Sequence, residues 1–229
     1  YLYNVAGHCF AVNVNEDDEI VSSLTQYEPF IIDATGEVPL VFELDVVKAS
    51  AFPSTEGLVE EITQDNEGSE STAGHVGDRP YFEFRLGGFV AGRLLCEPDY
   101  KHAVLTTAGE RSFGLNNSLM VLYALSTARL QTALFHSSVT SFRGKGYMFL
   151  GKSGTGKSTH SSLWLKYIEG TELMNDDNPV VRDGVVYGSP WSGKTACYRN
   201  VSYPLGGIVM LSQAPYNRME RLRGLPAYA

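Results

Sequence analysis

Alternation of apolar and polar residues predicts β-strands through most of the first half of the chain. The segment PLVFELDVV at 39–47 has apolar residues at every second position, so they share one face of a strand. The segment YFEFRL at 81–86 alternates in the same way, with acidic and basic residues on its other face. Segments 93–96 and 100–107 flank the turn residues EPD, a pattern typical of a hairpin.

Two longer segments break this alternation. Residues 63–80, TQDNEGSESTAGHVGDRP, are polar and rich in glycine, which predicts a mobile loop. Residues 112–135 are apolar on nearly all sides, which predicts a buried helix with residues 116–118 as its N-terminal caps. The change of pattern places a boundary near residue 110. It divides a β-rich region of unknown role, 1–110, from a second domain, 111–229.

The second half alternates short apolar strands with turns. SFRGKGYMFL at 141–150 and VVRDGVVYG at 180–188 each contain a glycine turn between two apolar pieces, which predicts two hairpins. GGIVMLS at 206–212 is apolar throughout and predicts a buried strand. The fold class predicted from these elements is α/β with α+β character, in which antiparallel hairpins lie beside the chemically active segment.

That segment is one of two matches to the phosphate-binding (Walker A) pattern G-x-x-x-x-G-K-[ST]. GKSGTGKS occupies 151–158, and GSPWSGKT occupies 188–195. A phosphate loop needs a strand before it, glycines that let backbone N–H groups turn inward, and a helix that begins at the Lys-[ST] pair. These three requirements separate the two matches.

The first match meets all three requirements. The strand YMFL precedes it, three glycines lie within it, and THSSLWLKYIE follows, with Leu163, Trp164, Tyr167 and Ile168 at helical spacing. In this arrangement Lys157 reaches the β- and γ-phosphates of a nucleotide, and the hydroxyl of the next residue binds Mg²⁺. The residues predicted to bind the nucleotide are Gly151, Ser153, Gly154, Thr155, Gly156, Lys157, Ser158 and Thr159.

The second match fails two of the requirements. Pro190, which has no N–H group, and Trp191 occupy the positions of the anion-binding amides, and the following TACYRNVSYP is not helical. We interpret this segment as a loop that follows the 180–188 hairpin. Two alternatives remain for its cations: an exposed turn with a solvated Lys194, or Lys194 or Arg199 directed at the phosphates or the substrate.

An acid pair follows twenty residues after the phosphate loop. Asp176 and Asp177 end an apolar strand, where carboxylates can bind Mg²⁺ or accept the proton of an attacking hydroxyl. His136 precedes the strand that leads through the RGKG turn into the loop, which makes it a candidate near the same centre. His160, on the helix after the loop, fits solvent and nucleotide equally well. The remaining histidines, His8, His75 and His102, are interpreted as structural.

Composition narrows the classes of partner. The chain has 229 residues, a net charge of −8 and 43% hydrophobic residues, which is ordinary for a globular protein. The acidic balance disfavours nucleic acid as the main partner. The cysteines Cys9, Cys96 and Cys197 lack a metal-binding spacing and are expected to be reduced and mostly buried, as in a cytoplasmic protein. The longest apolar run, 119–130, is too short to cross a membrane. A chain that starts at Tyr1 is also consistent with a trimmed protein or a fragment.

The residues around the loop resemble a known family. FLGKSGTGKST, followed by a strand that ends in Asp-Asp, is similar to the catalytic domain shared by HPr kinase/phosphorylase and ATP-dependent phosphoenolpyruvate carboxykinase. His136 lies fifteen residues before Gly151, the spacing found in the kinases, and the similarity spans about residues 134–212. The similarity implies a P-loop fold with additional antiparallel strands and with ATP and Mg²⁺ as ligands. It also implies a second substrate that accepts the phosphoryl group.

The resemblance also implies roles for single residues. Asp176 corresponds to the acid/base carboxylate and Asp177 to its partner near the metal, while His136 supports the phosphoryl-transfer centre. The predicted catalytic residues are therefore Asp176, Asp177, His136 and Lys157, and the predicted metal ligands are Ser158, Asp176 and Asp177. The predicted function is an ATP- and Mg²⁺-dependent kinase acting on a hydroxyl, such as that of a serine, in an unidentified protein or small molecule. A nucleotide-binding regulator without transfer activity and a carboxykinase-related enzyme are the alternatives, and a homo-oligomer remains open.

Overall fold

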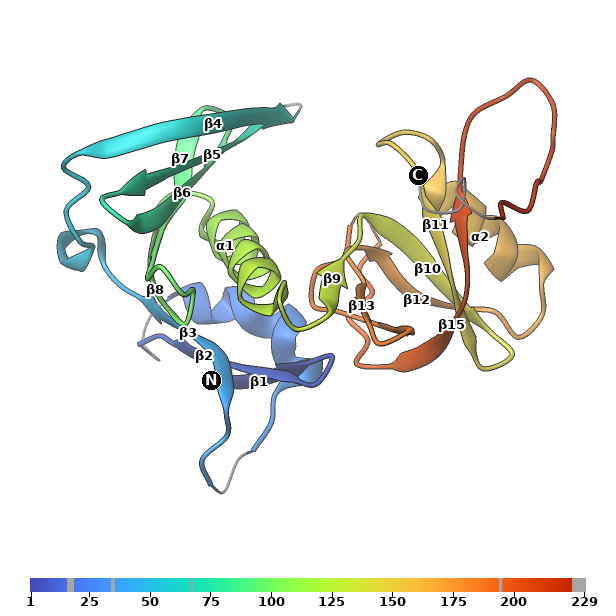
Figure 1. Cartoon of the computed structure of the whole chain (residues 1–229), viewed down its shortest axis with the longest axis horizontal. Helices are drawn as coiled ribbons and strands as arrows, with labels where there is room; N and C mark the ends of the chain where they lie inside the picture. The colour runs from blue at the N-terminus through green and yellow to red at the C-terminus, as the bar shows by residue number, and fades with distance from the viewer. Residues whose placement is uncertain (16–18, 34–35, 67, 194, 224–229) are drawn as a thin grey trace.

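The computed structural model of the chain describes residues 1–15, 19–33, 36–66, 68–193 and 195–223. The fold is mixed α/β and consists mostly of strands, which form two mixed sheets. An eight-stranded sheet contains the first half of the chain, and a seven-stranded sheet contains the second half (Figure 1).

The first sheet has the order β1-β2-β3-β8-β7-β6-β5-β4. β2, β3 and β8 are parallel neighbours, and the remaining pairs are antiparallel. Its strands are β1 (Leu2–Val5), β2 (His8–Asn13), β3 (Leu40–Val46), β4 (Leu58–Asn66), β5 (Ser69–Val76), β6 (Arg79–Leu86), β7 (Phe89–Cys96) and β8 (His102–Thr107); the 3₁₀ segments η1 (Glu19–Phe30) and η2 (Ala49–Ala51) lie between strands. The strand at 39–47 and the hairpin around EPD are thereby confirmed.

The predicted mobile loop at 63–80 is wrong. It contains the end of β4, the whole of β5 and the start of β6, which form an antiparallel ladder in which Thr63 pairs with Thr72 and Ala73 with Phe82. The strand period was hidden because β4 exposes nearly all of its side chains and lies at the sheet edge. Backbone pairing with β5 therefore orders a segment whose composition favours a loop.

The long helix α1 (Arg111–Thr127) lies in the curve of the first sheet, with β4–β7 on one side of it and β1–β3 on the other (Figure 1). Its residues Leu119 and Tyr123 join a fully buried core that includes Phe10 and Phe42, whose rings stack at 4.7 Å. The buried helix predicted over 112–135 is confirmed as far as Thr127, while its last part is wrong, because residues 132–134 form a strand. Its packing places α1 with the first sheet, while the proposed boundary near residue 110 stays a prediction.

The predicted caps at 116–118 are wrong, because α1 begins five residues earlier. The N–H groups of Phe113 and Gly114 already donate to the Glu110 carbonyl, at 3.0 and 3.2 Å. Asn116 instead uses its side chain in tertiary contacts, accepting hydrogen bonds from Gln26 at 2.8 Å and the Tyr27 hydroxyl at 3.0 Å. Tertiary partners have thus taken a residue type that otherwise favours a helix N-terminus.

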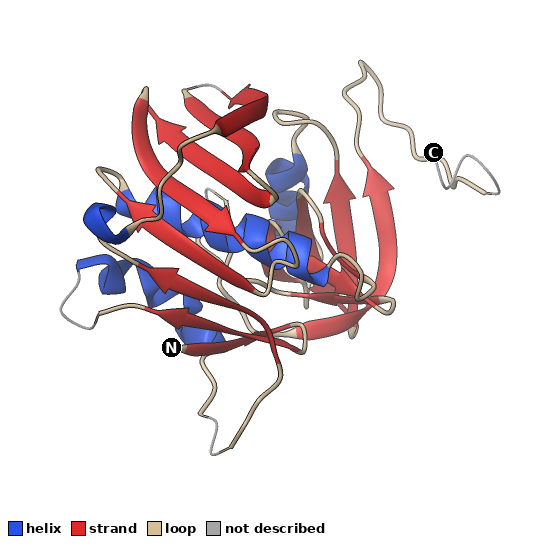
Figure 2. Cartoon of the chain, turned by 60° about the vertical axis from the view of Figure 1, so that its left-hand side comes forward, coloured by secondary structure: helices blue, strands red, loops and turns tan. Residues whose placement is uncertain are grey.

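The second sheet has the order β12-β10-β11-β15-β14-β13-β9. Figure 2, in which strands are red and helices blue, shows that strands make up most of the structure. Its strands are β9 (Thr132–Leu134), β10 (Ser137–Phe142), β11 (Lys145–Leu150), β12 (Glu172–Asp177), β13 (Val180–Arg182), β14 (Val185–Tyr187) and β15 (Ser202–Met210), and the helix α2 (Lys157–Tyr167) follows β11. β10–β11 and β13–β14 are the two predicted hairpins, joined by turns in which Arg143-Gly144 and Asp183-Gly184 have positive φ.

Two apolar patterns of the second half are less buried than predicted. β15 alternates half-buried and exposed residues, with Ile208 and Met210 on the open side, so GGIVMLS is not a buried strand. On α2, Trp164 packs against Phe149 of β11 at 5.3 Å, while Leu163 and Tyr167 are exposed. Helix α2 contacts the second sheet with one side only. Its apolar residues extend around more of the helix than that side, so some of them remain exposed.

The state of the cysteines and the character of the helices can be compared with the sequence predictions. All three cysteines are free, with Cys96 and Cys197 buried and Cys9 half-buried. Among the residues that the structure describes, neither α-helix combines the length and the apolar character that crossing a bilayer requires.

Helix α1 touches the first sheet backbone to backbone, which generates a test of this packing. A Cβ atom on Gly114 would overlap the Ala91 carbonyl and lie 2.9 Å from the Gly92 Cα. We expect Gly114→Ala to lower the free energy of unfolding by about 1–3 kcal/mol, because overpacking outweighs the higher helix propensity of alanine. Urea unfolding measures this. Gly36→Ala, where a Cβ would meet nothing within 4 Å, is the control, and equal effects in both variants would contradict the close approach.

Candidate functional site

The candidate site lies at one edge of the second sheet. β11 is parallel to β15 and antiparallel to β10, and β10 is antiparallel to β12, so the carboxyl ends of β11, β12 and β15 meet there. The register places Leu150 opposite Ser137 and Met210, and Ser138 opposite Asp176. Open mixed sheets bind ligands outside the carboxyl ends of such strands. The edge therefore gathers the phosphate loop and the acid pair from separate segments.

The loop 151–156 connects β11 directly to the N-terminus of α2. Gly154 and Gly156 have φ values of 78° and 102°, a left-handed region that other residues rarely adopt. Gln213, beyond β15, donates to the Gly154 carbonyl at 3.1 Å. The first N–H groups of α2 have no carbonyl one turn earlier within the helix, so they face the loop together with the positive end of the helix dipole. The strand, glycine loop and helix expected at 145–167 are all present.

The loop folds over the Lys157 side chain. Lys157 is 9% exposed, and its Nζ donates to the Gly151 carbonyl at 3.1 Å and to the Lys152 carbonyl at 3.4 Å. The Thr155 hydroxyl makes a short hydrogen bond to the same Lys152 carbonyl. Ser153, Ser158 and Thr159, predicted to bind the nucleotide, are exposed on the loop and the first turn of α2. The lysine cation is thus enclosed where the phosphates are predicted to bind.

Asp176 is held on the side of α2. Its Oδ1 accepts a hydrogen bond from Ser138 Oγ at 2.8 Å, and Ser138 Oγ lies 2.6 Å from Ser161 Oγ of α2. The residue is 6% exposed, and its Oδ2 is buried with no hydrogen-bond partner among the residues that the structure describes. A buried carboxylate oxygen left unpaired is costly unless a cation or a donor completes it.

Asp177 points the other way, because successive residues of a strand face opposite sides. Its Oδ1 lies 3.4 Å from His136 Nε2, and about a third of its side chain is exposed. Burial raises the pKa of the Asp177 carboxyl and the Asp176 charge adds to this, while His136 and Lys157 lower the pKa. The fold thus brings Asp177, which follows Lys157 by 20 residues, to His136, which precedes Lys157 by 21 residues, and close enough to Lys157 to be affected by its charge.

The structure bears on part of the two alternatives predicted for the second match to the loop pattern, and residues 193, 195 and 196 on either side of Lys194 are exposed. Residues 188–191 are buried, so an exposed turn is wrong for this part of the segment. Arg199 donates to Glu172 at 2.7 Å and to the Leu173 carbonyl at 2.7 Å, at the far end of β12 from the acid pair, so it does not face the phosphate loop. Lys194 lies outside the described residues. The absence of a helix after this segment is confirmed.

The other histidines divide by environment. His160 packs its ring edge-on against Phe149 at 4.7 Å, on the face that α2 presents to β11. His8 is buried, with Nε2 2.7 Å from Thr132 Oγ1, and burial lowers its pKa. His102 pairs with Asp45 at 2.9 Å, and His75 with Glu61 at 3.6 Å. The last three have structural partners in the first sheet and its junction with β9.

Sequence reasoning missed the residues that support the acid pair. Ser138, Asn175 and Ser189 contact the acid pair or its strand, and Ser161 contacts Ser138. Each is a common polar residue in an unremarkable local pattern, so no motif marks it. One signal could have indicated them: Ser137, Ser138 and Thr140 are polar residues close together in a short strand, and the side chains of this strand are almost all buried.

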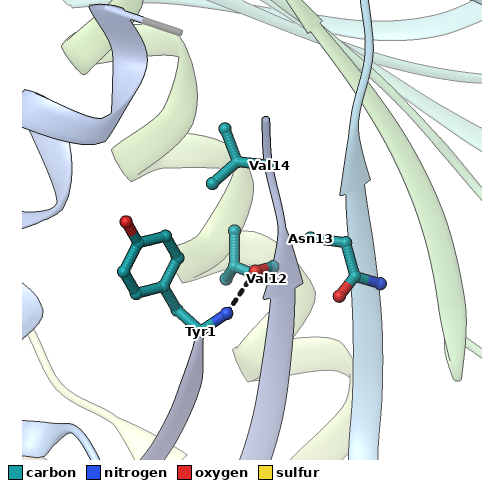
Figure 3. A pocket seen from close by; sticks show the side chains of 4 residues that line it. All are labelled: Tyr1, Val12, Asn13 and Val14. Atoms are coloured by element: carbon teal, nitrogen blue, oxygen red, sulfur yellow. Dashed lines mark hydrogen bonds between the residues drawn. The ribbon is translucent and has the colours of Figure 1, made fainter. Parts of the chain in front are cut away.

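Two open pockets lie on the first sheet, away from this edge. A shallow pocket of about 300 Å³ lies at the ends of β1 and β2 and is lined by Tyr1, Val12, Asn13 and Val14, none of which has an acidic or basic side chain (Figure 3). A second, of about 460 Å³, lies on the first sheet beside His75 and Tyr100. Within the described part of the chain, no three His, Cys, Asp or Glu side chains gather as a metal site.

The chain was also compared with known proteins. It matches no protein-family model and no curated protein.

The raised pKa of Asp177 predicts a stability gain on neutralising this residue. A carboxyl whose pKa is higher in the folded than in the unfolded chain destabilises the fold as the pH rises through those values. We expect Asp177→Asn to raise the melting temperature at pH 7, and the gain to disappear as the pH falls below the ordinary value of 3.8. Thermal unfolding across this range measures it. A variant less stable than the native chain at pH 7 would contradict the stated effect of burial.

Proposed function

We propose that the chain is an ATP- and Mg²⁺-dependent phosphotransferase, similar to HPr kinase, that transfers a γ-phosphate to a hydroxyl. The observation that carries the proposal is a single edge of a mixed sheet that joins three features. They are a glycine loop at a helix N-terminus, an enclosed lysine, and a carboxylate with a buried oxygen that has no hydrogen-bond partner in the described part of the chain. The antiparallel hairpins of the second sheet agree with the P-loop variety of that superfamily, and they support this fold as part of the proposal.

The loop would bind the phosphates through fixed donors. The N–H groups at the start of α2 and the left-handed glycines provide a concave set of amides, and anions bind such helix N-termini. Lys157 already lies beneath the loop, bonded to two carbonyls, and it would exchange these weak neutral partners for phosphate oxygens. Because the donors are in place before binding, little reorganisation accompanies it.

The residues present also fit a magnesium ion. Asp176 Oδ2 needs a partner, and the Ser158 hydroxyl is exposed on the first turn of α2, as a phosphate-loop serine should be. Mg²⁺ is usually bound by one or two carboxylates with water and phosphate oxygens as its other ligands, so a site without a larger acidic cluster is sufficient. When bound, the ion neutralises charge on the phosphates.

The two carboxylates differ in ways that suggest separate roles. The resemblance implies that Asp176 accepts the proton of the attacking hydroxyl. Exposure favours Asp177 for this step, because about a third of its side chain is accessible, and burial raises the pKa of its carboxyl, which strengthens it as a base. Asp176, buried and turned towards α2, is then placed for the cation. His136, beside Asp177, would orient that carboxylate and offset its charge.

The central experiment separates binding from transfer. We expect Lys157→Ala to remove the heat of Mg-ATP binding in calorimetry, while Lys166→Ala, an exposed lysine on the same helix, binds as the native chain does. Asp176→Asn and Asp177→Asn should retain MgATP binding, and each should lower single-turnover transfer of labelled γ-phosphate to acceptors in an extract by about 10²–10⁴-fold.

The outcomes discriminate among functions. Nucleotide binding without transfer by the native chain would favour a nucleotide-binding regulator. Transfer that requires Asp176 and tolerates Asp177→Asn would reverse the roles assigned to the pair. No heat with Mg-ATP or Mg-ADP in the native chain would contradict both the kinase and the regulator.

A further inference from the structure

The segment 188–193, the first part of GSPWSGKT, has no role in the chemistry proposed above. We propose that it positions the acid pair, with Asn175 as the positioning residue that joins the segment to Asp177. The catalytic consequence of this inference rests on the proposed function, whereas its structural consequence does not.

Asn175 is the link between the segment and the acid pair. It is fully buried, and its amide oxygen accepts the backbone N–H of Asp177 at 2.9 Å. Its amide nitrogen donates to Ser189 Oγ at 3.1 Å and to the Trp191 carbonyl at 3.2 Å. One side chain therefore bonds the acid strand and the segment 188–193 together. An aspartate there would lose the donated bonds, and an alanine would lose the accepted bond as well.

The segment itself is closed by Ser189. The Ser189 hydroxyl donates to the Asn178 carbonyl at 2.6 Å and accepts the Trp191 N–H at 3.2 Å. The Asn178 N–H donates to the Trp191 carbonyl at 3.2 Å. Polar groups that a phosphate loop would offer to an anion are here bonded to neighbouring protein groups. The segment is thus committed to a structural contact with residues on both sides of Asp177.

Trp191, inside the segment, packs into the core of the first sheet. Its indole N–H donates to the Tyr27 hydroxyl at 3.1 Å, and its ring lies 5.1 Å from that of Tyr123 on α1. Gln26 of η1 donates to the Pro190 carbonyl at 2.9 Å. The acid pair is therefore tied, through two short segments, to a large core that is already rigidly packed.

Gly193 brings the segment into direct contact with the acid pair. A Cβ atom at this position would lie 2.7 Å from the Asp176 carbonyl oxygen and 3.3 Å from Asp177 Cβ. Gly193, the second glycine of GSPWSGKT, thus permits the backbone of the segment to approach the two aspartates closely. Asn175 restrains the pair through bonds, and Gly193 restrains it through contact.

The test uses three variants that disturb this contact in different ways. Asn175→Ala and Ser189→Ala remove bonds, and Gly193→Ala adds a methyl group against the acid pair. Tyr81→Phe is the control for loss of a buried hydrogen bond, since the Tyr81 hydroxyl donates to Glu83 at 3.0 Å within the first sheet and not to the segment. Gly36→Ala is the control for an added methyl group. Thermal unfolding identifies any variant that does not fold.

Two measurements are made on the full chain. Amide hydrogen exchange reports the Asp177 N–H directly, and we expect Asn175→Ala to lower its protection about tenfold or more, because its acceptor is gone. Single-turnover γ-phosphate transfer from Mg-ATP should fall about 10–100-fold in all three variants, with less than about a threefold change in Mg-ATP affinity, since small misplacements of a reacting group are this costly. Both controls should match the native chain.

The results separate the inference from the proposed function. Unchanged Asp177 protection in Asn175→Ala would overturn the inference, whatever the chain does with ATP. A native chain that binds no Mg-ATP, with protection lost as expected, would overturn the kinase proposal and leave the positioning role supported. If Asn175→Ala fails to fold, the Ser189→Ala and Gly193→Ala variants decide, and normal transfer by both would overturn the inference.

Discussion

The constraint on which the structure depends is the meeting of three parallel strand ends at one edge of the second sheet. β11 delivers the glycine loop there, β12 delivers the acid pair, and β15 completes the floor by pairing with β11 as far as Met210. The antiparallel strand β10 lies between β11 and β12 and contributes Ser138, which bonds Asp176. Without this register the loop and the carboxylates would belong to unrelated surfaces.

The acid pair at this edge is restrained from opposite sides. Asp176 turns towards α2, where Ser138 and Ser161 form a buried chain of hydroxyls. Asp177 turns away, and its backbone N–H is fixed by Asn175. Adjacent carboxylates repel one another, so two buried or half-buried acids require such support unless a cation compensates them. Two neighbouring carboxylates held in this way lower the stability of the fold, which is typical of a functional site.

The sequence predicts the strand, glycine loop and helix of the first motif better than it predicts the long-range contacts around them. The strand, glycines and lysine of the phosphate loop are contiguous, so their pattern carries their structure, and His136 and Asp177 were placed near it by spacing. The role of the second motif could not be predicted from the sequence, because its residues bond to distant ones. Ser189 accepts a hydrogen bond from Asn175, about fifteen residues away, and Trp191 donates one to Tyr27, about one hundred and sixty residues away. Segment 63–80 failed for a related reason, since an edge strand is ordered by pairing rather than by its own composition.

The most direct test of the account is to observe the loop amides themselves while nucleotide binds. In ¹⁵N-labelled protein titrated with Mg-ATP, the backbone amides of Gly154, Gly156, Lys157 and Ser158 should show the largest chemical-shift changes, and those of Ser189 and Trp191 in the second motif much smaller ones. Shifts that concentrate on the second motif, or that leave Gly154 to Ser158 unaffected, would contradict the central claim that this loop binds a polyphosphate.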